Sequence, residues 1–144
     1  MSPAGAAKGA VVAVVLLLVL VALPAYASSA AAPSPVGMAL GSVVRYMFPE
    51  HVLALGAALA LISGAAVALE GAPRGLAILA QGVLGMIYFL LLLHMGALEV
   101  PVYVEGVRVT LGLTVTRGLM LIEAALALKA LEGANVAADR APPP

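Results

Sequence analysis

The fold is decided by two long stretches without Asp, Glu, Lys or Arg, HVLALGAALALISGAAVAL at 51–69 and GLAILAQGVLGMIYFLLLLHMGAL at 75–98, which EGAPR at 70–74 separates. Each stretch is long enough to cross the hydrocarbon core of a bilayer, which takes about 20 apolar residues. Because backbone amides and carbonyls in a bilayer have no water to bind, both stretches are expected to be helical. The sequence therefore predicts a transmembrane helical hairpin over 50–98.

The break between the two stretches has the residues of a tight turn. Gly71 can close the first helix in a left-handed conformation. Pro73 suits the first turn of the second helix, where its missing N–H is not needed.

The composition excludes several classes of protein. Of 144 residues, 64% are hydrophobic and 10% are charged, whereas soluble domains average about 45–50% and about 25%. The net charge is zero, so direct nucleic-acid binding has no support. The chain has no cysteine, and its two histidines, His51 and His94, lie far apart, so the sequence predicts no metal site.

The N-terminal residues 1–27 have the layout of a signal peptide. Lys8 precedes an apolar run from Ala10 to Leu23, and Pro24 is expected to end the helix before an A-x-A cleavage site at Ala25 and Ala27. The mature chain would then begin at Ser28. The alternative is an uncleaved N-terminal anchor helix. Residues 28–36 are small and broken by proline, as in a linker.

Residues 37–49 predict an interfacial amphipathic helix. Its apolar residues recur with helical spacing and form a stripe of Leu40, Val43, Val44 and Met47. Arg45 falls on the opposite face, from which it can reach lipid phosphates. The alternative is a segment folded against the helices as a cap.

The first helix of the hairpin carries a ridge of small residues at every fourth position, Gly56, Ala60, Gly64 and Ala68. Such ridges let membrane helices approach closely. The ridge is expected to pack on the second helix or on another copy of the chain. Gln81, in the second helix, is expected to make a hydrogen bond between helices.

The residue types change at 99–111, and the new pattern predicts a β-hairpin. β-Branched residues flank the turn Glu105-Gly106, and pairing outward sets Tyr103 opposite Arg108. An isolated two-stranded hairpin is marginally stable in water. Its valine face therefore requires a membrane surface, a neighbouring subunit or another hairpin.

Residues 112–133 predict a third transmembrane helix, which carries Arg117, Glu123 and Lys129. Successive charges point about 120° apart, so they cannot pair along one helix. Glu123 would lie near mid-bilayer, where it would either pair with a cation from another helix or be protonated. The leading candidate for the cation is Arg117 of a neighbouring copy. Gly133 is expected to end the helix, and residues 134–144 to form a disordered tail.

The sequence thus predicts an all-α integral membrane protein of the cell membrane, with a transmembrane helical hairpin plus a third, charged helix and a small β-hairpin between helices 2 and 3. No nucleophile elbow, glycine-rich phosphate loop or carboxylate pair occurs, so we expect no enzyme and no cofactor. The first hypothesis is a structural subunit that forms a homo-oligomer or joins a larger membrane complex. The second is an ion- or proton-conducting subunit that uses Glu123.

One known family has a similar layout over residues 1–98. A signal ending in Ala25-Tyr26-Ala27, a short amphipathic helix and two apolar helices joined by a loop with Arg74 resemble the major pilins of conjugative (mating) pili. The resemblance implies that the signal is removed and that the hairpins stack into an extracellular filament with bound lipid. It also implies that Arg74 contacts lipid headgroups in the lumen. Residues 99–132 have no counterpart in that layout.

Overall fold

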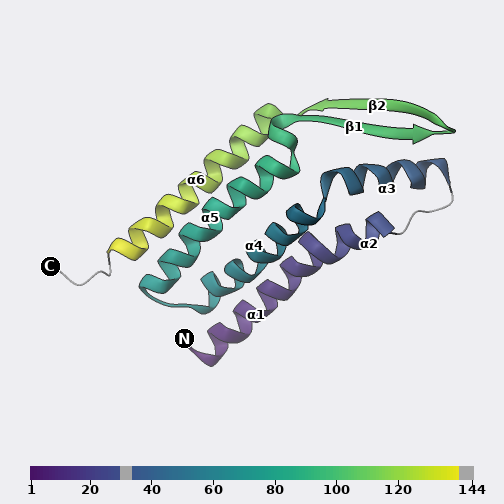
Figure 1. Ribbon diagram of the computed structural model, residues 1–144. Helices are drawn as coiled ribbons and strands as arrows, with labels where there is room; N and C mark the ends of the chain where they lie inside the picture. Colours follow the sequence, from purple (N-terminus) through teal and green to yellow (C-terminus); the bar gives the residue numbers. More distant parts are fainter. Residues whose placement is uncertain (30–33, 140–144) are drawn as a thin grey trace.

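The computed structural model of the chain describes residues 1–29 and 34–139 (Figure 1). Their elements are, in chain order, α1 (Pro3–Leu17), a π-helical turn η1 (Leu18–Ala22), α2 (Leu23–Ser29), α3 (Pro35–Met47), α4 (Glu50–Ala68), α5 (Ala72–Leu92), a 3-10 turn η2 (His94–Gly96), β1 (Ala97–Val104), β2 (Val107–Thr114) and α6 (Thr116–Ala138). Parts of the predicted linker (30–33) and of the predicted tail (140–144) lie outside the described residues.

The four long helices form one open layer in the order α1, α4, α5, α6 (Figure 1). Within the described residues, the inner helices α4 and α5 each pack along two neighbours, whereas α1 and α6 each pack along one. Neighbouring helices are antiparallel: a Cβ at Gly82 would meet Ala130, and one at Gly75 would meet Ala137. The start of α1 and the end of α6 therefore lie at the same end of the layer.

The N-terminal helix differs from the prediction, because Pro24 does not end it. The helix continues from α1 through η1 and α2 to Ser29, and Pro24 is buried within it. In the π-helical turn the Leu23 N–H bonds to the carbonyl of Leu18, five residues back. This wider turn before Pro24 accommodates a ring that would otherwise clash with the preceding turn. The predicted cleavage site is thus helical rather than extended.

The turn between α4 and α5 follows the prediction for Pro73, which lies in the first turn of α5, but not for Gly71. Helix α4 ends at Ala68 with Leu69 in an extended conformation, so Gly71 does not close it. Gly71 instead precedes α5 with φ 73° and ψ −151°, a conformation open to glycine. Glu50 lies in the first turn of α4, directly after Pro49.

The β-hairpin is confirmed in register and is longer than predicted. The pairs run from Val104↔Val107 at the turn through Tyr103↔Arg108 to Ala97↔Thr114. The strands cover 97–104 and 107–114 rather than 99–111, because Leu98 is buried and pairs with Leu113. The following helix accordingly begins at Thr116 and not at Gly112.

The end of α6 also corrects the prediction. Gly133 does not end the helix, which continues to Ala138, so residues 134–138 of the predicted tail are helical. Gly133 is buried against α5, and a Cβ there would lie 2.7 Å from the Gly75 carbonyl oxygen. Glycine is required at this position by the close approach of two helices, not by a turn.

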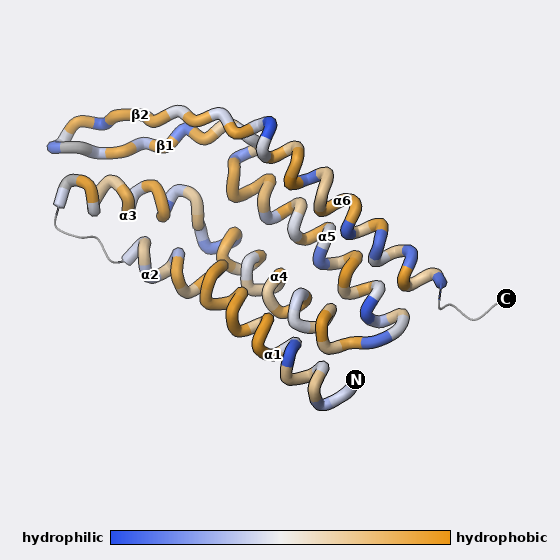
Figure 2. Tube along the Cα trace, turned by 180° about the vertical axis from the view of Figure 1, so that it is seen from behind, coloured by the Kyte–Doolittle hydropathy of each residue, from blue (hydrophilic) through white to orange (hydrophobic). Residues whose placement is uncertain are grey.

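Three helices in the described residues are long and apolar enough to cross a membrane: Pro3–Ser29, Glu50–Ala68 and Ala72–Leu92. Helix α6, predicted over 112–133 as the third transmembrane helix, is not one of them, because charged residues interrupt its apolar ones. Figure 2 shows the contrast between α1, which is apolar along most of its length, and α6, on which hydrophilic residues recur. The third helix long and apolar enough to cross a membrane is instead the N-terminal one, Pro3–Ser29.

Helix α3 and the hairpin extend together beyond one end of the helix layer (Figure 1). Helix α3 covers Pro35–Met47 rather than 37–49, and it packs on β1 through Ala39, Val43, Tyr46 and Met47. This face is rotated from the predicted stripe, since Tyr46 belongs to it and Leu40 is exposed. Helix α3 is thus folded against the β-hairpin, a partner that neither expectation named.

Candidate functional site

The small-residue ridge of α4 faces the N-terminal helix. A Cβ added at Gly64 would lie 2.7 Å from the Gly9 carbonyl oxygen and 2.8 Å from the Ala13 Cβ. Ala60 is fully buried, and the Cβ of Ala68 lies where a side chain on Gly9 would have to go. The ridge Gly56, Ala60, Gly64 and Ala68 therefore packs within the chain: Gly64 and Ala68 lie against α1, and Gly56 lies between Leu20 of η1 and Tyr88 of α5.

Gln81 links α5 to α4, as predicted. Its Nε2 donates a hydrogen bond of 2.8 Å to Oγ of Ser63, whose side chain is 3% exposed. The serine was missed from the sequence, because a small hydroxyl in an apolar helix gives no periodic pattern of its own.

A cavity of about 240 Å³ opens beside this hydrogen bond on one face of the layer. All four long helices contribute to its lining, and its polar members are Ser63, Arg74, Gln81, Lys129 and Glu132. Arg74 and Lys129, which the sequence placed in different roles, thus line one cavity together with Glu132. The cavity holds two cations and one carboxylate, so its formal charge is +1.

The three charges singled out in α6 remain apart. Arg117 and Lys129 are exposed, whereas Glu123 is partly buried and lies between Leu119 and Leu126 on the stripe that faces α5. Its Oε1 is buried and has no hydrogen-bond partner among the described residues. The predicted pair between Glu123 and Arg117 of a neighbouring copy stays a prediction.

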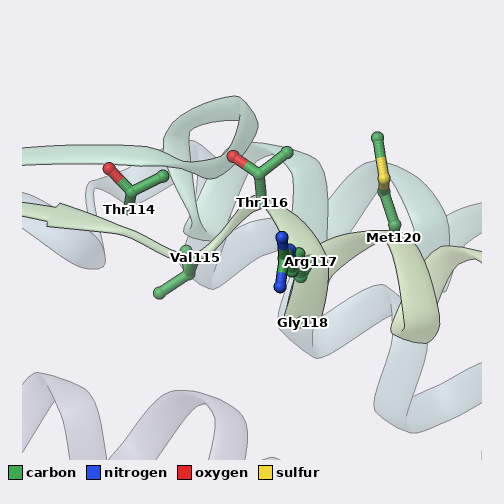
Figure 3. Close-up of a pocket in the computed structure, with 6 residues that line it drawn as sticks. All are labelled: Thr114, Val115, Thr116, Arg117, Gly118 and Met120. Atoms are coloured by element: carbon green, nitrogen blue, oxygen red, sulfur yellow. The ribbon is translucent and has the colours of Figure 1, made fainter.

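Arg117 lies at the junction of β2 and α6, beside a cavity of about 550 Å³ (Figure 3). Thr116 and Met120 project to the same side of the helix in Figure 3. The backbone N–H of Val115 donates to the carbonyl of Gly96, and the Thr116 hydroxyl lies 3.4 Å from the same oxygen. The junction is therefore fixed to the turn that follows α5.

The two arginines predicted to contact lipid headgroups, Arg45 and Arg74, are both exposed. Arg45 lies in the last turn of α3, and Arg74 in the first turn of α5 at the other end of the layer. The contacts of Arg45 and Arg74 with lipid headgroups stay predictions.

His94 joins the end of α5 to α3. Its ring stacks on that of Tyr46, with centroids 4.6 Å apart and planes 15° apart, and its Nε2 is buried without a hydrogen-bond partner in the described part of the chain. Residues 1–29 and 34–139 contain no group of three His, Cys, Asp or Glu side chains that could hold a metal ion.

The tightest helix contact was not recognised from the sequence. Helices α5 and α6 meet where the glycines of one lie on the backbone of the other: a Cβ at Gly82 would lie 2.8 Å from Ala130 Cβ and 2.8 Å from the Leu126 carbonyl oxygen. The spacing of Gly75 and Gly82 by seven residues, two helical turns, was the signal that could have indicated this contact.

Comparison of the chain with protein-family models, with curated proteins and with solved structures gave no match.

Proposed function

We propose that the protein is a non-catalytic membrane subunit that assembles side by side with further copies into a larger complex. The observation that carries the proposal is the open layer. Helices α1 and α6 each pack on one neighbour only, so both edges of the layer and both of its broad faces lack a protein partner within the described residues.

The free edge of α6 carries the spacing of a helix–helix contact. Gly118, Leu121, Ala125 and Leu128 follow one another at alternating steps of three and four residues, and all four are exposed. This spacing produces a continuous apolar seam on one side of a helix. A Cβ at Gly118 would meet no atom of the described residues within 4 Å, so a partner helix has room to approach closely there.

The opposite side of α6 is already occupied, since Leu126, Ala130 and Gly133 lie against α5. Helix α6 therefore has two seams, one used within the chain and one free. A second copy docked on the free seam would extend the layer in its own plane. Glu123 already faces α5, and the exposed charges Arg117, Lys129 and Glu132 would then lie closer to protein than to lipid. An unpaired charge in lipid is costly.

Truncation of the free seam tests this proposal. The double variant Leu121→Ala, Leu128→Ala removes most of the seam's apolar volume without touching the contact with α5. We expect it to shift the detergent-extracted protein from oligomer to monomer in native mass spectrometry. The double variant Leu61→Ala, Leu76→Ala, which removes two exposed leucines of α4 and α5 and leaves α6 unchanged, is the matched control and should leave the oligomer intact. An equal effect of the two variants would contradict the proposal.

A further inference from the structure

The apolar face of the β-hairpin is only half covered. Helix α3 packs on β1 and buries Leu98, Val100 and Val102. The cross-strand pairs continue the same face on β2, where Val109, Leu111 and Leu113 remain 44%, 54% and 61% exposed. Half of the sheet's apolar face thus has no partner within the described residues.

The uncovered strand and α3 form the two walls of a groove of about 350 Å³. Val43 and Met47 line it from α3, and Leu111, Gly112 and Leu113 line it from β2. Val36 and Leu40 precede Val43 and Met47 by seven residues each, which places them on the same stripe of the helix, and both are exposed. The apolar surface therefore continues along α3 beyond the groove.

The polar residues of each of these two elements lie on the side that faces away from the groove. On β2, Arg108 and Thr110 alternate with the apolar residues and so belong to the other face of the sheet. On α3, Arg45 lies about 160° around the helix from Val43. Each element is therefore amphipathic, and its polar side faces away from the contact between α3 and the hairpin, which leaves the apolar groove between them.

We infer that α3 and the hairpin lie on the surface of the bilayer, with lipid acyl chains in the groove between α3 and β2. The inference rests on the proposed location of the helix layer in a membrane. Four residues separate the end of α5 at Leu92 from the start of the hairpin at Ala97, so the hairpin lies at the level where an apolar helix leaves the hydrocarbon. Amphipathic segments at this level bury their apolar side at the boundary of headgroups and acyl chains.

A lipid surface fits the groove better than a second protein chain does. Interfaces between proteins carry polar groups that fix their register, at about one hydrogen bond per 100–200 Å². The side chains that line this groove are all apolar. Acyl chains require no register, so they fill such a groove without any polar partner.

The chain has no tryptophan, so one introduced tryptophan reports on its own surroundings. We compare Leu111→Trp, in the groove, with Thr110→Trp, on the opposite face of the same strand. Both positions are exposed, so both variants should fold. Each full-length variant is reconstituted into vesicles of dioleoyl phosphatidylcholine, with or without bromine on the acyl chains, and flotation of the vesicles first checks that the protein is embedded.

We expect brominated acyl chains to quench most of the Leu111→Trp emission and to leave Thr110→Trp almost unchanged. Acrylamide in the water should have the opposite effect on the two variants. If the Leu111→Trp emission is quenched by acrylamide, or is protected from both quenchers as it would be beneath a second chain, the inference is overturned. Failure of flotation would instead contradict the proposed membrane location, so the two claims are tested separately.

Discussion

The Nε2 of Gln81 lies 2.8 Å from the Oγ of Ser63, and this hydrogen bond joins α5 to α4 in an otherwise apolar contact. Water is absent from such a contact when helices are embedded in lipid, so each group depends on the other. Hydrogen bonds between membrane helices contribute about 0.6 to 2 kcal/mol. The bond also fixes the rotation of both helices, which directs Gln81 toward the polar cavity.

The first prediction concerns this bond. Gln81→Leu and Ser63→Ala should each lower the free energy of unfolding, and the double variant should lose less than the sum of the two. We expect a coupling energy of about 1 kcal/mol, measured by denaturant unfolding in detergent micelles. Additive losses, within about 0.3 kcal/mol, would show that the two side chains do not interact.

The second prediction concerns the contact between α1 and α4. Gly64→Ala places a Cβ 2.7 Å from the Gly9 carbonyl oxygen, so the helices must separate. We expect a loss of about 1–3 kcal/mol in the free energy of unfolding, the range for overpacking. Gly41→Ala is the control, because the nearest atom to its Cβ is the Arg45 guanidinium at 3.8 Å. That variant should be neutral or more stable by about 1 kcal/mol.

The third prediction is that the native protein keeps residues 1–27. The sequence allowed a cleaved signal peptide or an anchor helix. The contacts of Gly9 with α4 and the helical structure around Ala25 and Ala27 support the anchor. Intact-mass analysis of the protein from its native membrane should give a mass that includes these residues. A mass that begins at Ser28 would support the signal-peptide interpretation and the resemblance to pilins.

The fourth prediction separates assembly from ion conduction. Glu123→Gln removes a charge whose Oε1 is buried without a hydrogen-bond partner in residues 1–29 and 34–139, so the variant should fold and assemble as the natural chain does. Its proton flux, measured in vesicles with a pH-sensitive dye, should equal that of the natural chain. A loss of flux specific to Glu123→Gln would favour the conducting subunit instead.

Local patterns predicted the elements that depend on local chemistry. The two apolar stretches at 51–69 and 75–98 identified α4 and α5, and the turn Glu105-Gly106 fixed the register of the hairpin, because a two-residue loop leaves one pairing. Pro73 lies in the first turn of its helix for a similar reason, since its ring already has a helical φ.

Features that depend on a distant segment were missed. Gly133 has the sequence context of a helix end, but α5 brings the Gly75 backbone against it, so the glycine serves packing. Pro24 is tolerated within a helix because a π-helical turn precedes it, which no periodicity reveals. The order of the helices in one open layer could not be predicted either. An apolar stripe indicates that its residues are covered, but it does not indicate which segment covers them.

The measurement that tests the central claim most directly is the native mass of the full-length protein, extracted from its membrane in a mild detergent and diluted in steps. The open layer, with a free seam on α6, predicts species that are integer multiples of the protomer mass and that persist until high dilution. A protein that is monomeric at every concentration, with its membrane lipids retained, would contradict the account.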